Sequence, residues 1–258
     1  MVVLMLGDVV GPGGCEAVRA LLPQLKREYK ADFTVVNGEN SAAGNGILPS
    51  SAKHLLDSGA DVITTGNHVF RRREIHPLLD EADSPIIRPA NFSRENPGRG
   101  VTVLDNLRHR LAVVNLMGTS MLEPLRNPFD TIDEILKDIG AKCILLDFHA
   151  ETTSEKRAIG FYLDGRVSAV CGTHTHVQTA DEQVLPHGTA YITDLGMCGP
   201  YYSVLGVKPE AVINRFRTAM PTRFENAVGT MCVNGAVIDI DDRTGHALSI
   251  ERIARLWN

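Results

Sequence analysis

The chain has few cysteines, and their spacing excludes the common cysteine-based structures. Five of them are scattered over 258 residues, and no two form a C-x-x-C pair. An odd and widely spaced set is not the pattern of a disulfide framework or of a zinc site built from thiolates. We therefore expect the protein to lie in a reducing compartment, the cytoplasm.

Long apolar runs are absent as well. The first apolar stretch, residues 2–6, ends before Asp8 and is too short for the core of a signal peptide. No run approaches the roughly 20 apolar residues that crossing a bilayer requires. The sequence predicts a soluble protein without a membrane partner.

The chain also lacks an excess of positive charge. It has 26 Lys and Arg against 31 Asp and Glu, a net charge of -5. Proteins that bind duplex DNA present a basic surface, so duplex DNA is not expected as a partner. Small ligands remain possible. With 43% hydrophobic residues and no repeat, low-complexity tract or linker composition, residues 1–258 are expected to form a single domain.

Short apolar runs, mostly of branched residues, recur along the chain and predict buried strands. They lie at residues 2–6, 33–36, 62–65, 144–146 and 167–170. Helical patterns alternate with strands and cover residues 17–30, 71–82, 127–139 and 153–163. Closely spaced C-terminal strands, at 189–193, 229–233, 236–240 and 247–253, predict a second sheet that is rich in antiparallel pairs. The expected fold class is α/β, a sandwich of two mixed β-sheets flanked by helices.

A polar cluster follows each of the five runs. These clusters are Gly7-Asp8, Gly38-Glu39-Asn40, Gly66-Asn67-His68, His149 and His174-Thr175-His176. If the strands lie side by side in a parallel sheet, their carboxyl ends open onto one edge and the clusters meet there. Carboxylate, amide and imidazole ligands without thiolate suit iron or manganese, with zinc less favoured. The sequence thus indicates a site for two metal ions.

Taken singly, these residues have plainer explanations. Asp8 alone is typical of a helix cap or turn, and His149 alone of a hydrogen-bonded structural histidine. His174 and His176 could be a surface pair, although an extended segment would direct both rings to one side and Thr175 to the other. Gly66 would permit a sharp bend at the strand end. The metal-site interpretation depends on all the clusters meeting.

The order of the clusters resembles the strand-end motifs of the calcineurin-like metallophosphoesterases. Two departures stand out: Val10 occupies the position where that superfamily usually has histidine, and Glu39 followed by Asn40 replaces the second aspartate. With these departures the chain resembles the YmdB-like branch from Met1 to its C-terminus. The matching segments are Gly7-Asp8-Val9-Val10-Gly11, Asn37-Gly38-Glu39-Asn40-Ser41-Ala42, Thr65-Gly66-Asn67-His68, Asp147-Phe148-His149-Ala150-Glu151 and Gly172-Thr173-His174-Thr175-His176-Val177-Gln178-Thr179.

This resemblance implies a calcineurin-like metallophosphoesterase sandwich that binds two divalent or trivalent transition-metal ions. By position, the first metal would be held by Asp8, Glu39, Asn40 and His176, and the second by Glu39, Asn67, His149 and His174. Glu39 would bridge them, which fits the need for a shared anionic group between two cations. The implied substrate is a small cyclic nucleotide, above all a 2',3'-cyclic one, attacked by a metal-bridging hydroxide.

His68 has no metal in this assignment. It lies one residue beyond a ligand, and an imidazole titrates near neutral pH, so we interpret it as the general acid that protonates the leaving oxygen. A hydrogen-bonding loop histidine is the alternative.

Two other functions remain open, a regulatory module that senses a nucleotide with little turnover and an RNA-associated protein with a vestigial site. A homo-oligomer is also possible. The irregular stretch 85–100 and the loop 197–205, with Tyr201 and Tyr202, could cap the pocket or form a subunit contact.

Overall fold

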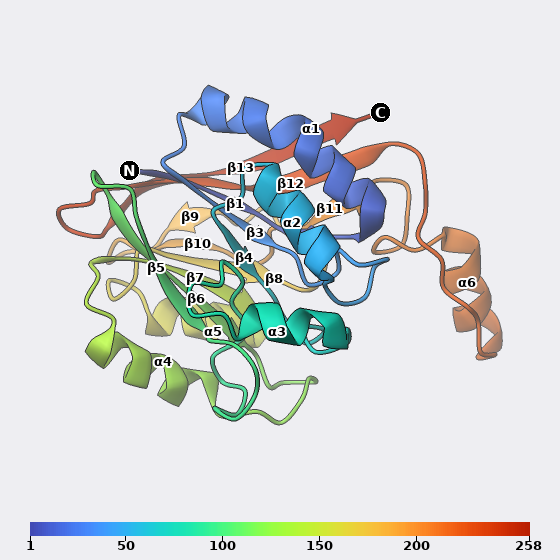
Figure 1. Ribbon diagram of the computed structural model, residues 1–258, viewed down its shortest axis with the longest axis horizontal. Coiled ribbons are helices and arrows are strands. Elements are labelled where there is room, and N and C mark those ends of the chain that lie inside the picture. The colour runs from blue at the N-terminus through green and yellow to red at the C-terminus, as the bar shows by residue number, and fades with distance from the viewer.

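The computed structural model describes all of residues 1–258 and contains two β-sheets that pack face to face (Figure 1). The seven-stranded sheet has the order β2 (Asp8–Val9), β11 (Met197–Pro200), β12 (Met231–Ile240), β1 (Val2–Leu6), β3 (Phe33–Asn37) and β4 (Val62–Thr64), and β13 (Ala247–Trp257) also pairs with β12. The six-stranded sheet has the order β5 (Val101–Asp105), β6 (Arg110–Met117), β7 (Cys143–His149), β8 (Ala169–Thr173), β10 (Ala190–Ile192) and β9 (Gln183–Val184).

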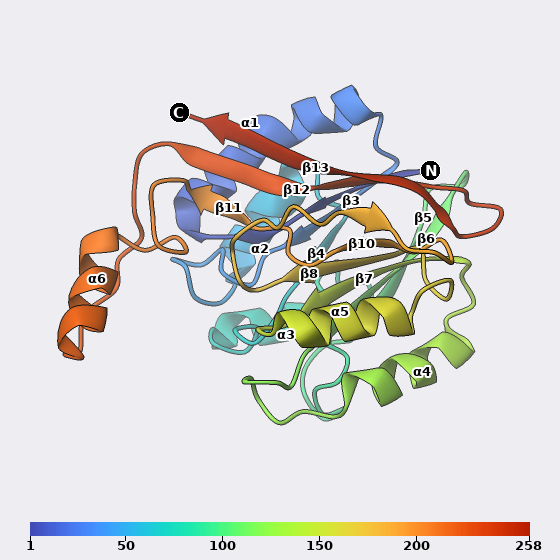
Figure 2. The same cartoon turned by 180° about the vertical axis from the view of Figure 1, so that it is seen from behind.

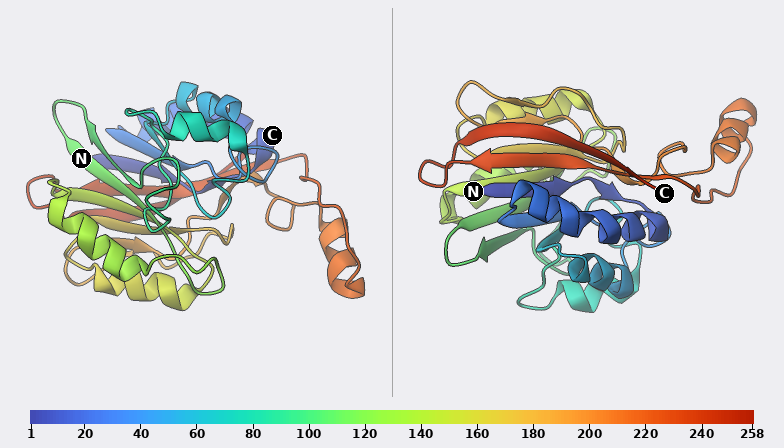
Figure 3. Two further views of the ribbon diagram at one scale, coloured as in Figure 1. Left: turned by 60° about the horizontal axis from the view of Figure 1, so that its bottom comes forward. Right: turned by 90° about the horizontal axis from the view of Figure 1, so that it is seen from above.

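Helices cover the outer faces of both sheets (Figure 2). Against the first sheet lie α1 (Gly11–Tyr29) and α2 (Pro49–Asp57), and against the second lie α4 (Pro128–Asp138) and α5 (Thr153–Tyr162). A short turn, η1 (Arg73–Ile75), leads into α3 (His76–Leu79), while α6 (Pro209–Thr218) stands away from both sheets (Figure 3). The expected α/β class, two mixed sheets flanked by helices, is confirmed. None of the helices combines the length and apolar character that crossing a bilayer demands.

The space between the sheets is filled by branched side chains from both. Val3 and Val35 of the first sheet belong to the same buried cluster as Val113 and Leu145 of the second. Strands β1, β3, β6 and β7 are buried on both faces, which is why their sequences are nearly continuous apolar runs rather than alternating ones.

The predicted separate C-terminal sheet is wrong. The runs 229–233 and 236–240 belong to one strand, β12, which pairs antiparallel with β1 of the first sheet, while β10 lies parallel to β8 in the second. Gly235 between the two runs does not mark a turn. A Cβ there would lie 2.3 Å from the Met5 carbonyl oxygen, so the glycine permits close approach of β1.

The predicted helix over 71–82 is also wrong in extent. Only η1 and the four residues of α3 are helical there. Pro77 lies in the first turn of α3, where its ring is tolerated, but a proline inside a longer helix would remove a hydrogen bond and clash with the preceding turn. The stretch therefore forms two short turns.

The polar clusters come from the carboxyl ends of strands in both sheets, not from one parallel sheet as the prediction had assumed. Parallel pairs join β1, β3 and β4 in the first sheet and β6, β7 and β8 in the second. The site therefore lies across the edge where the two sheets meet.

Candidate metal centre

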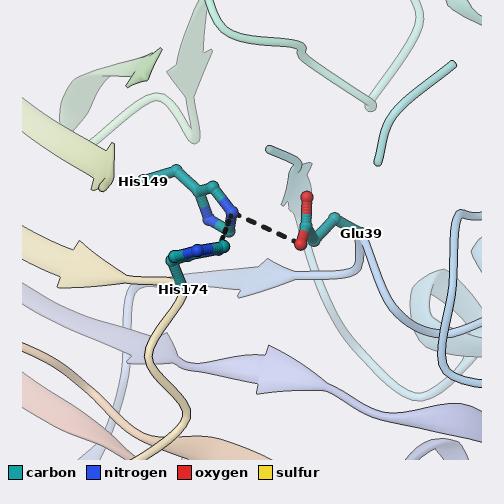
Figure 4. Close-up of side chains that lie close together, drawn as sticks. All are labelled: Glu39, His149 and His174. Carbon is teal, nitrogen blue, oxygen red and sulfur yellow. Dashed lines mark hydrogen bonds and ion pairs between the residues drawn. The ribbon is translucent and has the colours of Figure 1, made fainter. Parts of the chain in front are cut away.

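Three groups converge on the Nε2 atom of His149, the last residue of β7. Asn67 Oδ1 lies 3.0 Å away, His174 Nδ1 3.0 Å and Glu39 Oε1 3.3 Å. Figure 4 shows the carboxylate and the two rings directed at one another, and one ligand atom from each lies within 4.8 Å of the others. Such convergence of acceptors is what a cation requires.

Two of the three histidines donate an outward N–H to a neighbouring oxygen, and the third has its outward nitrogen beside a carboxylate. His176 Nδ1 lies 3.1 Å from the Leu205 carbonyl oxygen, and His174 Nε2 lies 3.0 Å from a Glu151 carboxylate oxygen. His149 Nδ1 lies 2.9 Å from the hydroxyl of Thr173. The inward nitrogens are thereby left to face the centre, as in histidines that bind metals.

Asp8 and Asn40 lie on the side of the centre that faces His176. Asp8 is fully buried and its Oδ2 accepts a hydrogen bond from the His174 backbone N–H at 3.0 Å, but its Oδ1 has no donor and lies 3.7 Å from His176 Nε2. An unpaired oxygen of a buried carboxylate is costly, so a cation bound there would stabilise it. The donor set as a whole fits metal ions.

The side-chain amide of Asn40 directs its nitrogen, not its oxygen, toward the candidate metal centre. Its nitrogen lies 3.0 Å from Glu39 Oε1 and 3.2 Å from His176 Nε2, and its oxygen lies 2.8 Å from His68 Nδ1. A half turn of the amide would present the oxygen to the ion. His68 lies at the rim, with 25% of its side chain exposed.

Charges in the centre strongly affect one another. Burial by itself would raise the pKa of Glu39, but the imidazoles of His149 and His68 hold that pKa well below its usual range. Burial disfavours the charged form of His149, yet Glu39 and Asp8 raise the pKa of His149 to about 9. Burial and the nearby His149 lower the pKa of His174 to about 3. Because a ligating imidazole must be deprotonated, metal binding at His149 would compete with a proton and would strengthen as the pH rises.

Gly66 allows the two halves of the centre to approach each other. A Cβ at this position would lie 2.3 Å from the ring of His149 and 2.4 Å from Glu39 Oε2. Its backbone is not left-handed. The close approach of His149 and Glu39 therefore requires the glycine, whereas a left-handed backbone does not.

His174 and His176 are directed to the same side, as predicted, but not because the segment is extended. Both have left-handed backbones, with φ of 101° and 64°. Thr175 is turned away, and its hydroxyl and N–H donate to Asp194 at 2.7 and 3.1 Å. Asp194 also forms a buried ion pair of 2.6 Å with Lys156. Left-handed non-glycine residues cost about 1–3 kcal/mol each, so this buried pair holds the loop in a conformation it would not adopt alone.

Two residues that orient His149 were not predicted from the sequence. The Thr173 hydroxyl donates its only proton to Asp147 Oδ1 at 2.7 Å and therefore accepts the Nδ1–H of His149. Asp147 is buried, which raises its pKa to about 6, although Thr64, Thr173 and His149 oppose the rise. An aspartate inside a buried strand, two residues before His149 and thus on the same face, is the signal that could have revealed it.

Replacing Thr173 by Val is expected to weaken metal binding about 10- to 100-fold, because the ring of His149 loses the partner that fixes its tautomer. Competition with a fluorescent chelator measures the affinity. Thr173→Ser keeps the hydroxyl and is the control, which should bind metal like the parent. Unchanged affinity in Thr173→Val, with the circular dichroism of the parent, would contradict this role.

The fold and the polar residues at the strand ends together define a class of protein. A two-sheet sandwich with helices outside and with carboxylate, amide and imidazole groups at the strand ends is the fold of the calcineurin-like metallophosphoesterases. The model of the YmdB-like protein family matches residues 4–253. The chain belongs to the YmdB-like family, as its motifs predicted.

Individual relatives match over nearly their full length. The chain is 49% identical to a Bacillus subtilis protein named 2',3'-cyclic-nucleotide 2'-phosphodiesterase, over 98% of this chain and 96% of that protein. A crystal structure of a hypothetical protein from Thermus thermophilus is similar with a TM-score of 0.94, 38% identity and complete coverage of both chains. A structure described as a novel phosphatase, from Mycoplasma pneumoniae, has a TM-score of 0.93 and 36% identity, over 99% of this chain and 93% of that one.

Proposed function

We propose that this protein is a metal-dependent phosphodiesterase that hydrolyses 2',3'-cyclic nucleotides. The observation that carries the proposal is the convergence of Glu39, Asn67 and His174 on His149 Nε2, beside the unpaired oxygen of buried Asp8. The substrate class is supported by the Bacillus subtilis relative, whose name states it and which matches this chain at 49% identity.

The ligand sets are proposed as the resemblance implied. The first metal is assigned to Asp8, Glu39, Asn40 and His176, and the second to Glu39, Asn67, His149 and His174. Iron suits these oxygen and nitrogen donors, manganese is the next choice and zinc the third. When bound, such ions polarise phosphoryl oxygens and lower the pKa of water.

His68 supplies the proton in the proposed reaction. Its backbone N–H donates to Glu39 Oε2 at 3.0 Å and its Nδ1 lies 3.3 Å from Glu39 Oε1, so the ring is held beside the ligands while part of it remains exposed. Water adds to phosphorus and the bond to the 2'-oxygen breaks. His68 protonates that oxygen as it leaves, and the product is a nucleoside 3'-phosphate.

Removing the metal is expected to abolish the reaction. Dialysis against a chelator should lower the hydrolysis of 2',3'-cyclic nucleotides by more than about 1,000-fold, because the ions supply several kcal/mol of transition-state stabilisation. Elemental analysis follows the metal, chromatography follows the nucleotide, and iron or manganese added back should restore turnover.

The same assay distinguishes a phosphodiesterase from the other two functions, a sensing module and a protein with a vestigial site. Hydrolysis that persists in metal-depleted protein would refute the proposal. A nucleotide that binds and is recovered intact after long incubation would identify a sensing module instead. Folded protein that takes up no metal would indicate a vestigial site.

A further inference from the structure

One buried carboxylate of the second sheet receives hydrogen bonds from three other strands. Asp147 lies two residues before the end of β7, and its side chain is fully buried. Its Oδ2 accepts from Asn37 Nδ2 at 2.9 Å and from the Thr64 hydroxyl at 2.5 Å. Its Oδ1 accepts from the Thr173 hydroxyl at 2.7 Å. The three donor residues are fully buried as well, so water does not compete for the carboxylate.

These bonds join the two sheets at the edge where the candidate metal centre lies. Asn37 is the last residue of β3 and Thr64 is the last residue of β4, and both strands belong to the first sheet. Asp147 and Thr173 belong to the second sheet. In the low dielectric between the sheets such bonds are strong, and a donor left without its acceptor is costly. The carboxylate therefore fixes the ends of β3 and β4 relative to those of β7 and β8.

Each residue of this network is followed, within three positions, by a proposed ligand of the second metal. The pairs of network residue and following ligand are Asn37 and Glu39, Thr64 and Asn67, Asp147 and His149, and Thr173 and His174. Two further hydrogen bonds reach the ligands themselves: the Glu39 backbone N–H donates to Asn37 Oδ1 at 3.2 Å, and His149 Nδ1 lies 2.9 Å from the Thr173 hydroxyl. The network thus reaches the whole ligand set of the second metal, three members of which converge in Figure 4.

The other ligands proposed for the first metal are held by different groups. The Asp8 backbone N–H donates to the Gly196 carbonyl oxygen at 3.1 Å, and the Gly11 N–H donates to the Asn40 carbonyl oxygen at 2.9 Å. His176 Nδ1 lies 3.1 Å from a carbonyl oxygen of the loop that follows β11. None of these bonds involves Asp147, so the two halves of the centre have separate supports.

We propose that Asp147 is the positioning residue of the second metal ion, because it holds the ligands of that ion, drawn from both sheets, at a fixed separation. This inference rests on the proposed function and its ligand sets. Partners behind the ligands orient them, and a site whose ligands are loosely held binds its ion weakly. Asp147 is not itself a ligand, so its replacement leaves the charges of Asp8 and Glu39 in place. The second ion should therefore be weakened and the first spared.

Titration of metal-free protein with Mn²⁺, followed by calorimetry and electron paramagnetic resonance, tests the proposal. The parent is expected to bind two ions per chain. Asp147→Asn should bind one of them about 10- to 100-fold more weakly and the other like the parent, because an amide has one acceptor oxygen in place of two. The resonance spectrum distinguishes a coupled pair of ions from a single ion. Asp164→Asn makes the same change at a 4% exposed carboxylate before the start of β8, at the end remote from His174, and should bind both ions like the parent.

Thr64→Val tests the same role by a smaller change, which keeps the proposal testable if Asp147→Asn does not fold. It removes one hydroxyl, keeps nearly the same shape and should weaken one ion about 10-fold, whereas Thr64→Ser should bind both ions like the parent. Equal weakening of both ions in Thr64→Val, or unchanged binding of both, would overturn the proposal if the protein keeps the parent's circular dichroism. A parent that binds a single ion would overturn it as well. The titration contains no nucleotide, so its result is separate from the hydrolysis that tests the proposed function.

Discussion

Glu39→Gln is expected to lose bound metal and phosphodiesterase activity together, with activity reduced by more than about 1,000-fold. Glu39 is fully buried, and its Oε1 lies 3.3 Å from the ring nitrogens of both His68 and His149. Glutamine has nearly the same shape but no charge, so two cations would share a neutral group and their repulsion would no longer be offset. Elemental analysis and turnover of a 2',3'-cyclic nucleotide, measured on the same preparation, check both losses.

Glu151→Gln is the matched control for this experiment. Glu151 lies at the rim, where its carboxylate oxygen is 3.0 Å from His174 Nε2, and glutamine keeps an oxygen and nearly the same shape there. This variant should keep its metal. Normal metal content in Glu39→Gln would be incompatible with the assignment of Glu39 as the bridge.

His68→Ala has the second largest expected effect, and it separates proton transfer from metal binding. The side chain is removed, but the backbone N–H of residue 68 still donates to Glu39 Oε2, so both ions should remain. General acid catalysis typically contributes 10²–10⁴-fold, and kcat should fall by about that factor. The loss should be greatest for alkyl esters and small for aryl esters, whose leaving oxygens need no proton.

His54→Ala is the control for the second experiment. His54 lies on α2, where its contact with a charged group is a 3.7 Å approach to Glu16, and its replacement should leave turnover unchanged. An equal loss of kcat for alkyl and aryl esters in His68→Ala would argue against a general acid and for a role in positioning the phosphate.

The location of the centre explains why the Glu39 variant acts on buried charge. The proposed metal ligands come from the ends of strands in two sheets, and Asp8, Glu39 and His149 are fully buried. In such a site an ionised group is stabilised only by its partners, so removing one member leaves the others unpaired. Losses are therefore expected to be shared by the whole centre rather than confined to one ligand.

Much of this arrangement was predictable from local sequence. Branched apolar runs predict strands because side chains buried on both faces of a sheet must be apolar along the whole strand. A polar cluster directly after such a run must lie at the strand end, and for that reason Asp8, Glu39, Asn67 and His174 could be expected to meet. The motifs then indicated the family, and residues 4–253 match its model.

Other features were outside the reach of local patterns. The sequence could not show that β12 pairs with β1, that Gly66 is needed to admit His149, or that His174 and His176 have left-handed backbones. Each depends on atoms from segments distant in the chain. The same holds for the bond from Thr173 to Asp147, 26 residues away, and for the ion pair of Lys156 with Asp194.

The apolar and polar residues and the period at which they recur are local properties of the sequence, and they decide the type of each strand and the chemistry at its end. How the two sheets face each other, which hydrogen bonds orient the imidazoles, and that α6 stands away from both sheets depend on the way distant segments pack. The physical reason is that periodicity reports the surroundings of a single segment, whereas close approach, hydrogen-bond partners and exposure are properties of pairs of segments that packing brings together.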